Sequence, residues 1–383
     1  MNSEPVTDEE ILSNWDDRQL DGLPTFESIV SKNLPGISIQ KILHTDQKYW
    51  ILDVRSEKEF EDSHLPGAES FPILNNQERR EVGLLYKYRG RDVAVHRALE
   101  FAKPKLDGLK KLTSLAVQRN LKPLVYCWRG GGRSAYATQI LNEAGIGAMR
   151  ITGGHKAYRK LVYQALYQEK IPQLIIFKGL TGVGKTDVLQ RLEGSFRVLD
   201  LEQCANHCAS SFGSIPYELS GHYSRLSQKC FEDGIYHALH LSKTTISRFG
   251  IIAESESKRI GHLIIPPAVF QAMKEAQTIE IQCSLEQRVE RIYRAYIGLN
   301  EAGIPLLKRD LATITPYVSK VQMDEWLNYL ETGKIRLLLQ ELLEDYYDRK
   351  YAGLYQQPLL KVDVTDLELG VQRIEDFLNS KPS

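Results

Sequence analysis

The sequence lacks a long apolar run, although 42% of its 383 residues are hydrophobic. No stretch approaches the roughly 20 residues that a membrane-spanning helix needs, so a membrane protein is not expected. The N-terminus is acidic and has no apolar core segment, which argues against a secretory leader. Five cysteines are too few for a disulfide framework in a chain of this length. We therefore expect a cytoplasmic protein whose cysteines are thiols.

The sequence also lacks net charge, with 49 basic and 49 acidic residues, yet the two signs are unevenly distributed. Residues 1–30 contain eight acids and one basic residue, Arg18. Residues 79–160 contain 18 lysines and arginines against five acids. Such a local positive field attracts a polyanion even when the whole chain is neutral. The alternative is a set of solvated helix faces.

Short apolar segments alternate with helical patterns, which predicts an α/β protein with parallel sheets. The expected strands are 49–54, 123–127, 147–151, 173–178, 197–200, 251–254 and 278–282. The expected helices are 134–144, 154–168, 185–192 and one within 266–276, and residues 285–383 have a mainly helical pattern. We predict an acidic N-terminal extension over 1–35, with a helix near 8–17, a first domain over 36–168 and a second over 169–383.

A cysteine loop follows the strand at 123–127. Cys127 ends the strand, and a helix begins a few residues later. Backbone N–H groups, a helix N-terminus and two arginines favour the thiolate there, so we expect Cys127 to be the nucleophile. Three glycines permit the tight cradle that would also hold a tetrahedral oxyanion. The predicted catalytic and oxyanion-binding residues around it are Arg129, Gly130, Gly131, Gly132, Arg133 and Ser134.

Two further segments make this region resemble a rhodanese domain. Asp53-Val-Arg55 precedes Glu59-Phe60, and residues 64–68 read His-Leu-Pro-Gly-Ala. In that family the cysteine accepts sulfur as a persulfide, or selenium as its analogue. The Cys-x5-Arg spacing is also found in rhodanese-like dual-specificity phosphatases, which leaves a phosphatase as a rival interpretation.

A phosphate-binding motif follows the strand at 173–178. Residues 179–186 read Gly-Leu-Thr-Gly-Val-Gly-Lys-Thr, which fits G-x-x-x-x-G-K-[ST], and they open a helix. Its glycines let N–H groups face phosphate oxygens, a lysine neutralises them and a threonine hydroxyl can hold Mg²⁺. The predicted phosphate-binding residues are Gly179, Thr181, Gly182, Gly184, Lys185 and Thr186, with Glu254 and Glu256 as acidic partners for Mg²⁺. We expect no tightly bound cofactor.

Cys204, His207 and Cys208 offer three potential zinc ligands. No fourth ligand is evident, so we interpret both cysteines as helix residues and predict no metal at this position.

The order of the two motifs resembles the tRNA 2-selenouridine synthase family, and several segments carry that resemblance. They are Asn75-Asn-Gln-Glu78-Arg79 with Val82-Gly83 and Tyr86-Lys87, Cys127–Ser134, Gly153-Gly154, Asp200-Leu-Glu202 with His207 and Ser211-Phe-Gly213, Glu254-Ser-Glu256-Ser257, and Glu344–Asp348. The chain departs from the family pattern at Cys208-Ala209, which replaces Arg-Gly, and at Lys258, which replaces Arg.

The resemblance implies an α/β rhodanese-like domain followed by a P-loop domain with a helical C-terminal part. It implies a transferase that converts wobble 2-thiouridine of tRNA to 2-selenouridine through an S-geranyl intermediate, with geranyl diphosphate bound at the P-loop and selenophosphate supplying selenium to Cys127. The basic segment would hold tRNA, and Tyr86, Tyr88 and Trp128 would stack on a base. The alternative is a sulfurtransferase or phosphatase fused to an ATP-hydrolysing domain.

Overall fold

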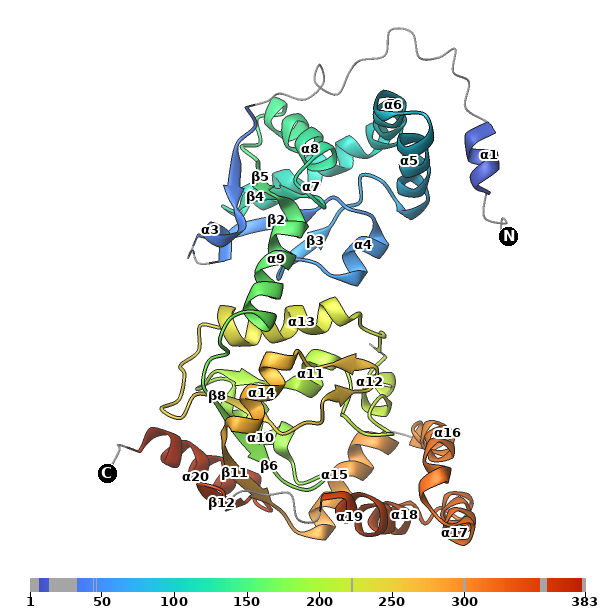
Figure 1. Ribbon diagram of the computed structural model, residues 1–383, viewed down its shortest axis with the longest axis vertical. Helices are drawn as coiled ribbons and strands as arrows, with labels where there is room; N and C mark the ends of the chain where they lie inside the picture. The colour runs from blue at the N-terminus through green and yellow to red at the C-terminus, as the bar shows by residue number, and fades with distance from the viewer. Residues whose placement is uncertain are drawn as a thin grey trace. The chain divides into compact units, whose positions relative to one another are not determined.

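The computed structural model describes residues 7–13, 33–43, 45, 47–221, 223–298, 301–351 and 357–380. The chain forms two compact units, Met1–Val162 and Tyr163–Ser383, and each is described by itself (Figure 1). The helix expected at 8–17 is seen as α1 (Asp8–Ser13), and residues 14–17 lie outside the described residues. Across the described residues no helix combines the length and the apolar character that crossing a membrane requires.

The first unit contains a sheet of five parallel strands in the order β1-β5-β4-β2-β3. The strands are β1 (Gly36–Ser38), β2 (Tyr49–Asp53), β3 (Ala68–Ser70), β4 (Lys122–Tyr126) and β5 (Met149–Thr152). Strands β2, β4 and β5 agree with the predicted segments. Leu52 of β2 and Val125 of β4 are fully buried, because a central parallel strand is covered on both faces.

Helices surround this sheet. They are α3 (Ile39–Leu43), α4 (Glu57–Asp62), α5 (Asn76–Tyr88), α6 (Arg91–Ala102), the short η2 (Lys103–Lys105), α7 (Leu106–Gln118), α8 (Gly132–Glu143) and α9 (Gly154–Tyr167). Helices α7 and α8 pack against β4 and against each other, while α5 and α6 lie side by side (Figure 1).

The family-like segment at residues 75–79 has a structural explanation at the start of α5. The Asn75 side chain accepts a hydrogen bond from the Glu78 N–H (2.8 Å), and the Glu78 carboxylate accepts one from the Asn75 N–H (2.7 Å). This reciprocal cap satisfies N–H groups that a helix start leaves unpaired. Glu78 also accepts a hydrogen bond from Lys105 Nζ (2.5 Å), so the cap fixes α5 against η2.

The second unit contains a parallel sheet in the order β12-β11-β6-β8-β7. Its strands are β6 (Leu174–Lys178), β7 (Val198–Leu199), β8 (Ile251–Glu254), β11 (Gln277–Gln282) and β12 (Leu360–Asp363), and β9 (Arg259–Ile260) with β10 (Leu263–Ile264) forms a separate hairpin. The expectation of a mainly helical stretch over 285–383 missed β12. That strand lies at the sheet edge, and Val362 is its one buried residue.

Helices α10 and α20 pack together beside this sheet, and α15 to α18 with η6 build a second core around Trp326. The helices are α10 (Lys185–Leu192), α11 (Leu201–Ala205), α12 (Ile215–Leu219), α13 (Gln228–Tyr236), η3 (His237–Leu241), α14 (Pro267–Glu275), α15 (Leu285–Ile297), α16 (Ile304–Ile314), η5 (Thr315–Tyr317), α17 (Lys320–Glu331), α18 (Ile335–Glu341), η6 (Leu342–Tyr347), α19 (Asp348–Tyr351) and α20 (Leu367–Asn379). The predicted fold class, α/β with two parallel sheets and a helical C-terminal region, is confirmed.

Candidate functional site

Cys127 lies between the end of β4 and the start of α8. Its side chain is 4% exposed, and its Sγ lies 3.2 Å from the Ser134 hydroxyl, which also donates to the Gly131 carbonyl (3.2 Å). Helix α8 begins at Gly132, so the thiol sits beside the N-terminus of a 12-residue helix. The partial positive charge at a helix start favours an anion there. The structure thus brings the cysteine and its predicted loop together at one point.

The first turn of α9 is hydrogen-bonded to the backbone of the cysteine loop. The His155 N–H donates to the Cys127 carbonyl (2.9 Å), and the Lys156 N–H donates to the Trp128 carbonyl (2.8 Å). Gly154 has φ +56, and a Cβ on it would collide with the Cys127 carbonyl oxygen. A side chain at 154 would therefore displace the loop, which explains why the sequence has Gly-Gly at 153–154.

The two arginines of the loop have different environments. Arg133 donates two hydrogen bonds to the Glu59 carboxylate (2.7 and 3.2 Å) and so is held against α4, whereas the Arg129 side chain is exposed. Burial alone would raise the pKa of Glu59, but the hydrogen bond from Arg133 and the charges of Arg133 and Arg79 outweigh it and lower that pKa to about 2. The sequence did not predict this ion pair, because 74 residues separate its partners.

Asp53 and Arg55 of the rhodanese-like signature form a buried pair. The Arg55 Nε donates to both carboxylate oxygens of Asp53 (3.0 and 2.9 Å), and its Nη2 donates to the Ser63 carbonyl (2.6 Å). These bonds fasten the turn at 63–68 to the end of β2. The pair therefore holds the turn in place at the C-terminal end of β2.

A cavity of about 530 Å³ opens beside Cys127. Trp128, Arg129 and Arg133 of the cysteine loop line it, as do residues of α5 and α6. No local sequence pattern predicts this cavity, because it forms where α5, α6 and the cysteine loop meet.

In the second unit the phosphate motif connects β6 to α10. Gly182 and Gly184 have φ +78 and +93, and a Cβ on them would lie 2.9 Å from Ile292 and Arg291 respectively. Both positions therefore need glycine. Lys185 Nζ donates to the Gly179 carbonyl (3.2 Å). A cavity of about 510 Å³ is lined by most of the predicted phosphate-binding residues, namely Thr181, Gly182, Gly184, Lys185 and Thr186.

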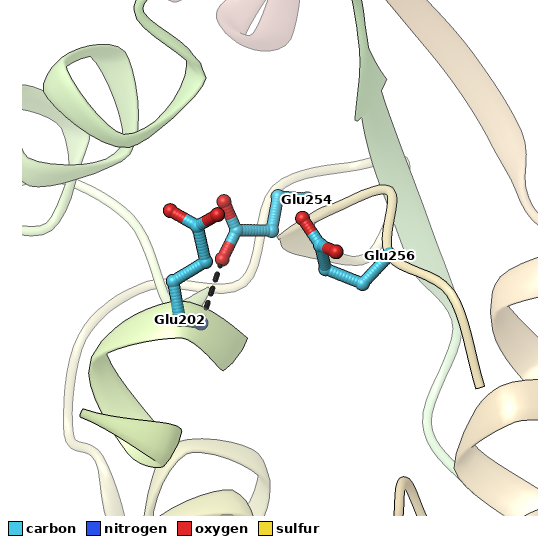
Figure 2. A group of neighbouring side chains, drawn as sticks. All are labelled: Glu202, Glu254 and Glu256. Atoms are coloured by element: carbon cyan, nitrogen blue, oxygen red, sulfur yellow. Dashed lines mark hydrogen bonds between the residues drawn. The ribbon is translucent and has the colours of Figure 1, made fainter. Parts of the chain in front are cut away.

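Three carboxylates converge next to this loop (Figure 2). Glu202, Glu254 and Glu256 each offer an oxygen within 4.8 Å of the others. The Glu202 N–H donates to one Glu254 oxygen (2.9 Å), and the other Glu254 oxygen is buried without a hydrogen-bond partner. The Thr186 hydroxyl donates to Glu202 (3.1 Å). The sequence predicts Glu254 and Glu256 as acidic partners for Mg²⁺. It does not predict Glu202 as a third, because Glu202 stands out only as part of a segment that resembles the family.

Burial raises the pKa of Glu202, although the charge of Lys185 and the hydrogen bond from Thr186 oppose that rise. Burial, followed by repulsion from Glu202, raises the pKa of Glu254, and it raises the pKa of Glu256 to about 8. Carboxylate and hydroxyl oxygens are the ligands that Mg²⁺ prefers, and a divalent cation would relieve this repulsion. The orphaned Glu254 oxygen and the adjacent Thr186 hydroxyl therefore fit a magnesium ion.

The alternative zinc ligands do not converge. Among the residues that the structure describes, the three glutamates are the one grouping of side chains suited to a metal, and it includes none of Cys204, His207 and Cys208. Burial and nearby acids raise the pKa of both thiols, which keeps them neutral. Cys208 and Ala209, where the family pattern has Arg-Gly, line the phosphate-loop cavity. Ala209 has φ +31, a conformation that favours glycine.

Each of the two sites lies in a segment that matches a known family model. Residues 38–161 match the model of the rhodanese-like domain, and residues 172–322 match the model described as the tRNA 2-selenouridine synthase AAA domain. The protein therefore belongs to the class in which a rhodanese-like domain is followed by a phosphate-loop domain.

Proteins named tRNA 2-selenouridine synthase resemble the chain over most of its length. The one from Hahella chejuensis is 34% identical over 80% of this chain and 86% of its own. The one from Chromohalobacter salexigens is 34% identical over 87% and 95%, and the one from Nitrosomonas europaea is 30% identical over 80% and 74%. The chain belongs to the tRNA 2-selenouridine synthase family.

Proposed function

We propose that this protein is a cytoplasmic transferase that exchanges the sulfur of 2-thiouridine at the wobble position of tRNA for selenium. The observation that carries the proposal is the buried Cys127 at the N-terminus of α8, in a chain whose second unit holds a phosphate loop. Relatives that align over most of the chain are named for this activity.

The phosphate loop suits the first step, alkylation of the 2-thio group by geranyl diphosphate. Its N–H groups and Lys185 would hold the diphosphate, which departs as the sulfur attacks the first carbon of the geranyl group. Mg²⁺, when bound, would neutralise charge on the leaving diphosphate. Glu202, Glu254 and Glu256 would hold the ion together with Thr186.

The cysteine loop suits the second step, in which selenium replaces the alkylated sulfur. Selenophosphate would dock its tetrahedral phosphate against the N–H groups of the loop, with its selenium beside Cys127. At the base, the Cys127 thiolate would attack C2, the C2–S bond to the alkylated sulfur would break and that sulfur would depart as geranyl thiol. The selenium of selenophosphate would then attack C2 and displace Cys127, and water would cleave the P–Se bond and release phosphate. Alkylation makes the sulfur a better leaving group, which is why the two steps belong in one order.

The segment 79–160 suits tRNA binding, although its field is weaker than the residue counts indicate. Arg79, Arg97 and Lys105 form ion pairs with Glu59, Glu81 and Glu78. Two aromatic side chains on α5, Tyr86 and Tyr88, are more than half exposed. Tyr86 and Trp128 both line the cavity beside Cys127, where a base could stack.

The test is nucleoside mass spectrometry of tRNA incubated with the purified protein, geranyl diphosphate and selenophosphate. We expect 2-selenouridine only when both donors are present, and S-geranyl-2-thiouridine when selenophosphate is omitted. The alternative, a sulfurtransferase or phosphatase fused to an ATPase, predicts ATP hydrolysis without tRNA and no selenated nucleoside. That pair of results would overturn the proposal.

A further inference from the structure

The cavity beside Cys127 is far larger than selenium transfer alone requires. It measures about 530 Å³, whereas one water molecule occupies roughly 30 Å³ and a tetrahedral oxyanion only a few times that. Pockets of roughly 300–1,000 Å³ enclose organic ligands. The cavity therefore has room for a second group besides the oxyanion that docks against the loop.

The walls of the cavity show which kind of group fits. Away from the cysteine loop they consist mainly of aliphatic and aromatic side chains, among them Val82, Ala94, Val95, Ala98 and Leu99. Three arginines, Arg79, Arg129 and Arg133, also line the cavity, and they suit an anion. Burying a charged phosphate against the aliphatic part of the walls is costly, so an anion does not belong in that part. An uncharged hydrocarbon chain does.

The position of the reactive groups fixes the orientation of that chain. Cys127, Trp128 and Arg129 of the cysteine loop and the aliphatic residues of α5 and α6 line the same cavity. A hydrocarbon attached to the sulfur of a uridine would extend toward α5 and α6. Its base would then remain at Cys127 and within reach of the Trp128 ring.

We propose that this cavity binds the geranyl chain of the S-geranyl-2-thiouridine intermediate and thereby places its C2 atom at Cys127. The inference rests on the proposed function, and it assigns to the rhodanese-like unit a hydrocarbon site separate from the phosphate loop. The geranyl chain would raise the affinity of the cavity for the intermediate, because a nucleoside without it makes no contact with the apolar walls.

Gly83 provides a way to fill the cavity without disturbing the fold. It lies inside α5 and lines the cavity, and a Cβ placed on it meets no atom within 4 Å. Gly83→Leu therefore projects a side chain into open space, and it also replaces a poor helix former. Ala98→Phe fills the cavity from α6. Gly147→Leu is the matched control, because its Cβ also meets open space but it does not line the cavity.

The experiment measures affinity of the full-length protein for anticodon stem-loop RNAs that carry S-methyl, S-dimethylallyl or S-geranyl 2-thiouridine. For wild type and Gly147→Leu we expect affinity to rise at least about 30-fold from methyl to geranyl, within the limit of roughly fourfold per buried CH₂. In Gly83→Leu and Ala98→Phe most of this increase is lost, while binding of the S-methyl RNA is unchanged. Thermal unfolding verifies that the variants are folded.

A second measurement uses wild type alone. S-geranyl RNA, but not S-methyl RNA, is expected to protect Cys127 from iodoacetamide. Equal affinity for all three RNAs, or no protection, would overturn the inference. Failure of the proposed function has a different signature, namely that wild type forms no 2-selenouridine from geranylated RNA and selenophosphate. If wild type forms it and both cavity-filling variants bind geranylated RNA like wild type, the cavity assignment alone is wrong.

Discussion

The cavity beside Cys127 and the cavity at the phosphate loop are similar in size and opposite in chemistry. The cavity at Cys127 has mainly apolar walls and one nucleophile, whereas the cavity at Lys185 has a phosphate loop, a hydroxyl and acids. The first suits a hydrocarbon chain and an attacking chalcogen, and the second suits a diphosphate and a cation. The difference indicates a division of labour, in which each half-reaction depends on its own cavity and proceeds when the other cavity is disabled.

Removal of the nucleophile gives the largest effect. Cys127→Ser should lower selenium incorporation by on the order of 10³-fold or more, because a hydroxyl is a far weaker nucleophile at C2 than a thiolate. Geranylation of 2-thiouridine tRNA should remain within about threefold of wild type. Nucleoside mass spectrometry measures both products. Normal selenation by this variant would remove Cys127 from the mechanism.

Loss of the phosphate-loop lysine should give the reciprocal pattern. Lys185→Ala removes the charge that neutralises the diphosphate, so the rate of geranylation should fall roughly 10²- to 10³-fold. Selenation of RNA that is already geranylated should be unaffected. An unchanged geranylation rate would show that the loop does not serve this step.

The carboxylate cluster tests the metal assignment with an effect on stability. Glu254→Gln removes a carboxyl whose pKa is raised by burial and by neighbouring acids, and with it the cost of folding that group at neutral pH. The protein without metal should therefore melt higher by about 2–4 °C. The stabilisation that Mg²⁺ gives to wild type should be lost in the variant. Thermal unfolding with and without Mg²⁺ reports both, and an undiminished Mg²⁺ effect would place the ion elsewhere.

The ion pair beside the cysteine loop affects stability in a way that depends on pH. The folded protein holds the pKa of Glu59 at about 2, below its ordinary 4.5, so its stabilisation is complete above pH 4.5 and is lost as pH falls through about 2. Glu59→Gln should lower the free energy of unfolding by roughly 2 kcal/mol at pH 7 and by progressively less in acid. Urea unfolding at pH 7 and pH 3 measures this, and a difference independent of pH would indicate lost packing instead.

The sequence predicted most of the elements that build the two sites. Strand β4, the loop after it and helix α10 were recognised because an apolar strand followed by glycines and a helix is a local pattern. Local patterns also located Cys127, which directly follows β4, and Lys185, which is the first residue of α10.

What the sequence did not predict depends on contacts between distant residues. The Glu202 N–H donates a hydrogen bond to Glu254, which is 52 residues away in the sequence. Arg133 forms an ion pair with Glu59, which is 74 residues away. The apolar cavity needs α5, α6 and the cysteine loop together, and no one of them encodes it. Strand β12 has a single buried side chain, too little to produce a periodic signal.

Complementation between the two disabled variants tests the division of labour most directly. Cys127→Ser and Lys185→Ala are mixed with 2-thiouridine tRNA, geranyl diphosphate and selenophosphate. Because Cys127→Ser makes the geranylated intermediate and Lys185→Ala consumes it, the mixture should form 2-selenouridine although neither variant does so alone. Absence of 2-selenouridine from the mixture, with both half-reactions intact when assayed separately, would contradict two independent sites.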